Sequence, residues 1–183
     1  MTSSPIHPET LYSLPTPEAY MTLALSLARR SPPKQSNFRV GAVLVSSASN
    51  TILSTGYTLE LPGNTHAEQC CLSKLAASHG LPEERAGEAL GEELGAVMYC
   101  TMEPCGRRLS GQESCVRRIL RTREGAGGIG KVFMGVMEPE TFVGESTGRR
   151  MLEEHGVECT LVGGLEEEIL SVAKSGHRAG AEA

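Results

Sequence analysis

The amino-acid sequence predicts an α/β protein with a mixed five-stranded sheet that carries helices on both faces. Segments with strand and helix character follow one another in the order α-β-β-α-β-α-β-α-β-α. Strands that are separated by helices favour parallel pairing, whereas the first two strand segments are close enough in sequence to form a hairpin. A chain of 183 residues with 39% apolar residues is large enough to bury the core of one domain.

The first part of the chain supplies a helix, two strands and a second helix. The spacing of apolar residues predicts a helix over 17–31, and Pro17 suits the first turn of a helix. Residues 38–47 are almost continuously apolar, as buried strands are, and residues 51–60 form the second strand. The next helix covers 67–80 and ends at a glycine, which commonly closes helices.

The middle of the chain holds an acidic segment and the third strand. Residues 81–95 are acidic and interrupted by glycine, which predicts a solvated insertion with a short helix. Residues 96–102 form the third strand. A helix that includes 115–122 follows, and its start is expected near Gly111. The glycine-rich residues 123–130 are expected to form a flexible loop.

Two further strands and two helices complete the predicted fold. The strands are expected over 131–136 and 157–164, and the helices over 147–156 and 165–178. The chain is expected to divide into an N-terminal tail (1–16), one domain (17–177) and a C-terminal tail (178–183).

Charge and composition exclude several classes of function. The net charge of −5 and the pI of about 5.6 argue against broad nucleic-acid binding, which needs a basic surface. No apolar run approaches the roughly 20 residues of a membrane helix, and the N-terminus lacks the pattern of a secretory signal. We therefore expect a cytoplasmic protein, in which the six cysteines stay reduced and do not form disulfides.

A possible metal site begins in the stretch THAEQ, residues 65–69. His66 lies at the start of a predicted helix, and Cys105 and Cys115 follow the third strand. Loops at the ends of strands gather at one edge of an open α/β sheet, so these three side chains can meet there. One histidine and two cysteines are typical of a catalytic zinc site, which keeps its fourth position for water.

Glu68 lies two residues after the predicted histidine ligand and could act beside the metal without binding it. Zinc lowers the pKa of bound water from about 15.7 to about 7, so a carboxylate there could carry protons near neutral pH. The alternative is structural, because residues 65–68 also fit a capping box at a helix start. The same pattern occurs at 110–113, where capping is the leading interpretation.

Other cysteines and histidines have no comparable pattern. Four cysteines are expected to pack in the core: Cys70, Cys71, Cys100 and Cys159. Three histidines are expected to lie on the surface or to pack: His7, His155 and His177. For His79, contact with a helix C-terminus is favoured over metal binding.

The arrangement of these motifs over roughly residues 16–175 resembles the zinc-dependent cytidine-deaminase superfamily, whose signature is H-x-E followed by P-C-x-x-C. One feature departs from it, because nine residues separate the two cysteines in CGRRLSGQESC. This longer segment, with SNFRVGAVLV and HAEQ, is similar to the riboflavin-pathway deaminases, and particularly to the fungal enzymes. The resemblance implies a three-layer α/β/α sandwich of the cytidine-deaminase type, one zinc ion per subunit, and a homodimer or larger oligomer.

The resemblance also implies a substrate and the residues that bind it. The substrate would be 2,5-diamino-6-ribitylamino-4(3H)-pyrimidinone 5'-phosphate, a small phosphorylated pyrimidine, with Asn37 at its ring or sugar and the Ala67 amide at the reacting group. Asn37 could instead form only an Asx-turn. Arg107 and Arg108, with Ser110, form a basic loop suited to phosphate, although both guanidinium groups could simply pair with surface carboxylates.

Two rival functions remain open at this stage. A deaminase of another small nucleobase, nucleoside or nucleotide would use the same zinc chemistry and would not require a phosphate. A non-catalytic zinc protein that serves as an interaction domain would need a fourth protein ligand, for which Cys70 and Cys100 are candidates.

Overall fold

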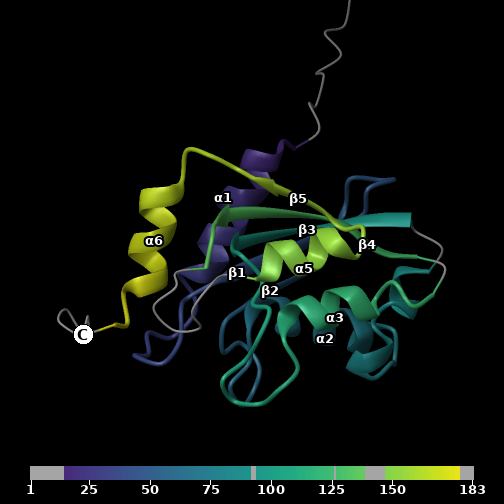
Figure 1. Cartoon of the computed structure of the whole chain (residues 1–183), viewed down its shortest axis with the longest axis horizontal. Helices are drawn as coiled ribbons and strands as arrows, with labels where there is room; N and C mark the ends of the chain where they lie inside the picture. The colour runs from purple at the N-terminus through teal and green to yellow at the C-terminus, as the bar shows by residue number, and fades with distance from the viewer. Residues whose placement is uncertain (1–14, 92–93, 126, 139–146, 178–183) are drawn as a thin grey trace, which may run out of the picture.

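The chain is built around a five-stranded sheet, with strands in the order β2-β1-β3-β4-β5 in the computed structural model (Figure 1). The strands are β1 (Gly41–Val45), β2 (Ile52–Tyr57), β3 (Leu94–Met102), β4 (Gly128–Val136) and β5 (Glu158–Leu161). The structure describes residues 15–91, 94–125, 127–138 and 147–177, so most of the predicted N-terminal tail and all of the predicted C-terminal tail lie outside the described residues.

The directions of the strands bring several loops to one edge of the sheet. Strand β1 pairs antiparallel with both β2 and β3, whereas β3, β4 and β5 are parallel to one another. The predicted hairpin and the predicted parallel pairing are both confirmed. Because β2 and β3 are each antiparallel to β1, they run in the same direction. The segments that follow β2, β3, β4 and β5 therefore leave the sheet at the same edge, where α/β proteins bind their ligands.

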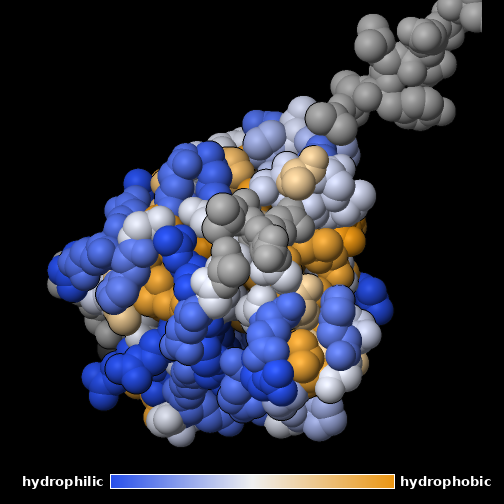
Figure 2. Space-filling model, turned by 90° about the vertical axis from the view of Figure 1, so that its right-hand side faces the viewer, coloured by the Kyte–Doolittle hydropathy of each residue, from blue (hydrophilic) through white to orange (hydrophobic). Residues whose placement is uncertain are grey.

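Helices cover both faces of the sheet, as predicted, and complete a three-layer α/β/α sandwich. One face carries α1 (Pro17–Ala28) and α6 (Glu166–Lys174), and the other carries α2 (Ala67–Ser78), α3 (Cys115–Arg121) and α5 (Gly148–Glu154) (Figure 1). Among the described residues, no helix is both long and apolar enough to cross a bilayer. On the face drawn in Figure 2, hydrophobic residues lie in separate patches between hydrophilic ones.

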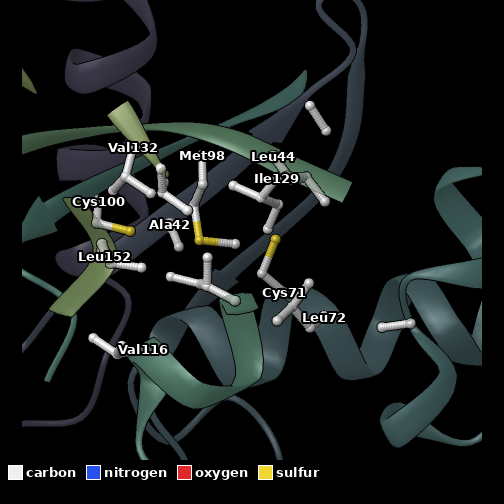
Figure 3. Close-up of a cluster of buried hydrophobic side chains, with 14 of the residues drawn as sticks. Ala42, Leu44, Cys71, Leu72, Met98, Cys100, Val116, Ile129, Val132 and Leu152 are labelled. Atoms are coloured by element: carbon white, nitrogen blue, oxygen red, sulfur yellow. The ribbon is translucent and has the colours of Figure 1, made fainter. Parts of the chain in front are cut away.

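The residues of β1 alternate between the two cores. Ala42 and Leu44 pack among the side chains of α2 and α3, whereas Val43 and Val45 pack among those of α1 and α6. Figure 3 shows Ala42 and Leu44 near Met98 of β3 in the first of these cores. Because successive side chains of a strand point to opposite faces, a strand that is covered on both sides must be apolar throughout.

Several boundaries depart from the prediction, among them the start of α3, which lies at Cys115 rather than near Gly111. Residues 128–130, expected in a loop, belong to β4, and a Cβ atom on Gly130 would lie 2.8 Å from the Cα of Gly95. The glycines there permit close approach of two strands. Of the predicted insertion 81–95, the described residues 81–91 are largely exposed or half-buried and form two short 3-10 helices, Glu83–Arg85 and Glu88–Leu90, as expected, although Ala86 and Leu90 are buried against the α2 side of the core; residues 94 and 95 belong to β3.

Candidate active site

The predicted metal ligands come from two neighbouring segments at the carboxyl edge of the sheet. His66 is the N-cap residue of α2, which follows β2. Cys105 follows β3, and Cys115 is the first residue of α3, whose N-terminus is capped by Ser114. Since β2 and β3 point to the same edge, the sheet places these segments side by side.

The three side chains form a group that matches the size of a zinc ion's ligand shell. The Nδ1 atom of His66 lies 3.5 Å from the Sγ of Cys105 and 3.5 Å from the Sγ of Cys115. All three ligand atoms lie within 4.8 Å of one another. Zinc bonds of about 2.3 Å to sulfur and about 2.0–2.1 Å to nitrogen, at tetrahedral angles, separate such atoms by roughly 3.6 Å. The residues present therefore fit zinc.

Neither Cys70 nor Cys100 belongs to this group in the part of the chain that the structure describes. The six described cysteines are buried and free of disulfides, as predicted. Burial raises the pKa of Cys71 to about 12 and that of Cys159 to about 11, so these thiols stay protonated in the core. Three described ligands from two segments are the arrangement of a catalytic zinc site rather than of a closed structural one.

The two ligand cysteines share an electrostatic environment that favours metal binding. A hydrogen bond from the Cys115 side chain, together with the nearby His66, holds the pKa of Cys105 well below its usual range. The same contact and burial raise the pKa of Cys115. Without metal the pair therefore holds one proton, on Cys115, and a coordinating cation would displace it.

Glu68 lies against the ligand group and is only 3% exposed. Its Oε2 atom accepts a hydrogen bond of 3.3 Å from the Sγ of Cys115. Burial raises the pKa of this carboxyl, and the negative charge of Cys105 adds to the shift. The alternative capping-box interpretation is wrong, because α2 has no side-chain cap and the Oγ1 of Thr65 donates to the carbonyl of Leu61 instead.

A pocket opens above this group and contains most of the residues that the sequence predicted for substrate binding. Its walls come from the segment before β1, the turn before α2 and the segments after β3 and β4. The lining residues are Ser36, Asn37, Phe38, Val40, Thr58, Asn64, His66, Glu68, Met102, Glu103, Cys105, Arg107, Arg108, Leu109, Ser110 and Glu138.

Asn37 is half-buried on the pocket wall, and its side chain bonds to two neighbours. The Nδ2 atom donates to the Oδ1 of Asn64 at 2.7 Å, and Oδ1 accepts from the hydroxyl of Ser36 at 2.8 Å. Its amide group is therefore oriented by side chains rather than by an Asx-turn. Ala67, the first residue of α2, is buried, and the first amides of a helix have no acceptor within the helix.

The structure separates the two predicted phosphate-binding arginines. Arg108 is 6% exposed, and it donates from Nη1 to the Oε1 of Gln69 at 2.9 Å and from Nη2 to the carbonyl of Asn64. Arg107 and Ser110 are exposed at the rim of the pocket. Arg108 therefore bonds to neutral groups of α2 and of the turn before it, rather than to the surface carboxylates of the alternative interpretation.

The predicted capping box at 110–113 is not what the chain forms. Helix α3 begins at Cys115, and the hydroxyl of Ser114 accepts from the amide of Arg117 at 3.3 Å. A capping box needs its first residue at the helix N-cap, so the pattern at 110–113 was coincidental. The residues in question instead extend the loop that lines the pocket.

Five polar residues of the pocket lining were not among the predicted site residues: Ser36, Thr58, Asn64, Glu103 and Glu138. Glu138 follows β4, and its backbone amide donates to the Oε2 of the buried Glu103 at 3.0 Å. Burial raises the pKa of Glu138 to about 8, and the negative charge of Cys105 adds to the shift. The position after a parallel strand was the only signal in the sequence for this residue.

Comparison with known proteins places these features in a family context. The profile of the family described as "Cytidine and deoxycytidylate deaminase zinc-binding region" matches residues 15–134. The chain is 36% identical over 160 residues to the diaminohydroxyphosphoribosylamino-pyrimidine deaminase of Schizosaccharomyces pombe, covering 87% of this chain and 35% of that protein. It thus spans about a third of the length of this curated relative.

Solved structures are similar to this chain over most of its length. The Rib2 deaminase of Aspergillus oryzae, studied as a C-terminal deletion mutant in complex with DARIPP, has 52% sequence identity and a TM-score of 0.82. The alignment covers 89% of this chain and 93% of that one. A deaminase and reductase of Thermotoga maritima has 26% identity and a TM-score of 0.66, covering 87% of this chain and 40% of that one.

Proposed function

Because this chain belongs to the cytidine and deoxycytidylate deaminase zinc-binding family, we propose that it deaminates 2,5-diamino-6-ribitylamino-4(3H)-pyrimidinone 5'-phosphate in cytoplasmic riboflavin biosynthesis. The observation that carries this proposal is the pocket itself. It combines a group of three zinc-type ligands and a buried carboxyl at its base with an exposed arginine and a serine at its rim.

We assign His66, Cys105 and Cys115 as the zinc ligands and Glu68 as the proton carrier. When bound there, zinc supplies a Lewis acid that makes water nucleophilic near neutral pH. Glu68 is buried beside the ligands, so its carboxyl is shielded from bulk solvent and exchanges protons within the pocket. Its raised pKa favours holding a proton between the two transfers that the reaction needs.

The reaction balances with one water and one ammonia. The water oxygen forms a bond to the ring carbon that bears the 2-amino group, and Glu68 passes a water proton to the adjacent ring nitrogen. Glu68 then takes the remaining proton from the added hydroxyl and delivers it to the amino group, the carbon–nitrogen bond breaks, ammonia leaves, and a carbonyl remains. We assign the Ala67 amide, at the N-terminus of α2, and the side chain of Asn37 to positioning the ring during these steps.

The position of Arg107 supports a phosphorylated substrate. An exposed guanidinium at a pocket rim can form bidentate bonds to phosphate, and Ser110 adds a hydroxyl on the same loop. Arg108 already donates to Gln69 and Asn64, so we assign it to holding the loop against α2 rather than to phosphate. The similarity to the Aspergillus oryzae protein in complex with DARIPP supports the same substrate class.

The test is ammonia release by zinc-loaded protein. The substrates to compare are the phosphorylated ribityl compound, its ribosyl counterpart, its dephosphorylated form and cytidine. We expect turnover of the phosphorylated ribityl compound and little or none of cytidine. Turnover of cytidine or a free base in preference to the phosphorylated compound would contradict the proposed substrate and leave the zinc site standing.

We further propose that the chain acts as a homodimer, as its resemblance to the superfamily implies. Light scattering should then give twice the 19.5 kDa mass of the chain. A mass of one chain at working concentration would contradict the dimer.

A further inference from the structure

We propose that the segment after α6, residues 175–177, is a positioning element for the pocket, and that His177 is its principal residue. This segment follows α6 and lies against the stretch between α1 and β1 that forms one pocket wall, Ser36–Phe38 (Figure 1). The inference rests on the proposed function for its effect on catalysis, but its structural part can be tested without a substrate.

The side chain of His177 contacts two residues of the wall directly. Its Nε2 atom lies 3.1 Å from the backbone carbonyl oxygen of Asn37. A carbonyl oxygen only accepts, so Nε2 carries the proton and donates. The imidazole ring also packs on the ring of Phe38, with centroids 4.9 Å apart. Asn37 and Phe38 both line the pocket, so one histidine holds two consecutive residues of its wall.

Neighbouring residues tie the same two segments together. The amide of Arg39 donates to the carbonyl of Ala173 at 3.1 Å, and its Nη1 donates to the hydroxyl of Ser175 at 2.6 Å. Gly176 lies so close to Lys34 that a Cβ atom there would be 2.5 Å from the Lys34 amide nitrogen. The end of α6 is therefore fitted to this loop along its length and not only at His177.

We call these contacts from residues 175–177 the tether. The pocket wall needs the tether because the wall itself has little regular secondary structure. Residues 32–36 are exposed, and a single β-bridge between Lys34 and Asn37 is the regular pairing recorded for the described part of this loop. Segments with exposed backbone and few buried contacts open most readily. A hydrogen bond and a ring contact from another element lower the number of conformations that Asn37 can adopt before substrate binds.

The tether reaches the metal site through one further contact. The Nδ2 atom of Asn37 donates to the Oδ1 of Asn64 at 2.7 Å, and Asn64 precedes His66 by two residues. The carbonyl of Asn64 also accepts from Arg108 of the rim loop. Displacing Asn37 would thus disturb where the substrate sits, whereas the ligands themselves are held by α2, by α3 and by the segment after β3. The expected effect falls on substrate binding more than on zinc binding.

The experiment compares His177→Ala and His177→Gln with His155→Ala in the zinc-loaded full chain. His155 is the matched control, since its Nδ1 also bonds to a backbone carbonyl, that of Met151 at 2.7 Å, and it does not line the pocket. The readouts are kcat and KM for the phosphorylated pyrimidine, zinc content, and hydrogen exchange of the backbone over residues 34–39.

We expect His177→Ala to raise KM about three- to tenfold, the size of one hydrogen bond, with kcat changed less than about twofold. Zinc content should stay the same, and exchange over 34–39 should become faster. His177→Gln keeps a donor and should recover most of both effects, and His155→Ala should behave as the unaltered chain. Unchanged KM and exchange in His177→Ala, or a glutamine variant that behaves like the alanine variant, would overturn the proposal. If the unaltered chain releases no ammonia from this substrate, the proposed function fails and the exchange data alone decide the tether.

Discussion

Glu68 is the side chain on which the proposed chemistry depends most directly. Glu68→Gln keeps the shape of the carboxyl but cannot carry a proton, so turnover should fall by about 10²–10⁴-fold while zinc content is retained. The measurement is ammonia release alongside metal analysis. Glu60→Gln is the control, because it likewise replaces a carboxylate by an amide. Glu60 is partly buried, pairs with Lys74 at 2.6 Å and lies outside the pocket. Equal turnover in Glu68→Gln and the unaltered chain would contradict the role of Glu68.

Alanine substitutions of Arg107 and Arg108 should have different effects on KM for the phosphorylated and the dephosphorylated substrate. Arg107→Ala should raise KM for the phosphorylated substrate about 10- to 100-fold and leave the dephosphorylated one unaffected, since charged hydrogen bonds contribute about 1.5–3 kcal/mol. Arg108→Ala should weaken both substrates alike, because it removes the bonds that hold the loop to Gln69 and Asn64.

Arg117→Ala provides the control for charge alone. Arg117 is exposed on α3 and does not line the pocket, so its removal lowers the positive charge without touching the rim. Steady-state kinetics with both substrates make the comparison. An equal rise in KM for the two substrates on mutation of Arg107 would argue against phosphate binding by that residue.

The residue types made the base of the pocket predictable from the sequence. The residues of its walls could not be predicted in the same way. Histidine and cysteine are uncommon and have a narrow range of chemistry, so His66, Cys105 and Cys115 could be selected by type and position. Asn64 and Glu138 are ordinary polar residues whose role comes only from where the chain folds. The distinction between Arg107 and Arg108 also depends on burial, which adjacent residues of the same type do not reveal.

Among the elements, the start of helix α2 carries His66, Ala67 and Glu68. The contact of this helix with β2 determines how far these residues lie from the sheet. A Cβ atom on Gly56 would lie 2.2 Å from the carbonyl oxygen of Ala67. Gly56→Ala should therefore push the first turn of α2 outward, lowering both stability and zinc occupancy of the folded protein. The measurement is metal content of the folded fraction, with thermal unfolding alongside.

Gly41→Ala supplies a matched control on the other face of the sheet. A Cβ atom there would lie 1.9 Å from the carbonyl oxygen of Ala24 in α1, so the clash is comparable but distant from α2. Both variants should unfold at lower temperature, and only Gly56→Ala should also lose zinc from molecules that remain folded. Equal zinc occupancy in the two variants would contradict the view that the contact between α2 and β2 sets the geometry of the site.

The elements themselves followed from the sequence wherever apolar periodicity was strong. Strand β1 is apolar at each position because both of its faces are buried. The prediction failed at 128–130, where glycines that allow β4 to approach Gly95 resemble those of a loop. At 81–91 the expected exposure and short helices are found, but the abundant charges hid two residues, Ala86 and Leu90, that are buried against the core. Local composition does not show which few residues of a polar segment turn inward.

At the scale of the whole molecule, the pocket joins segments that are far apart in sequence. The stretch before β1, the start of α2, the loop after β3 and the residue after β4 meet because the strand directions bring them to one edge. The contact between His177 and Asn37 spans 140 residues of sequence. Such a pairing has no local pattern, so its prediction requires the order of the strands and the packing of α6.

Zinc should stabilise the whole fold because its ligands join α2 to the segment between β3 and α3. A ligand that binds only the folded state stabilises it by about 4 kcal/mol when its free concentration is about 1,000 times Kd. For a domain of this size we expect a chelator to lower the melting temperature by on the order of 10 °C. His66→Ala should remove the difference between zinc-loaded and chelator-treated protein.

Cys159→Ala separates loss of the metal from loss of packing. Cys159 is buried in the core outside the ligand group, so its truncation should lower the melting temperature equally with and without zinc. His66→Ala should instead lower it mainly for the zinc-loaded protein, since the unmetallated fold loses a half-buried side chain and its contacts with the two ligand cysteines. The unaltered chain and His66→Ala, each measured with and without zinc, form a thermodynamic cycle. Its interaction term is the part of the stabilisation by zinc that depends on His66. If chelation left the melting temperature of the unaltered chain unchanged, zinc would not be joining the two segments, and the assignment of the three ligands would fail.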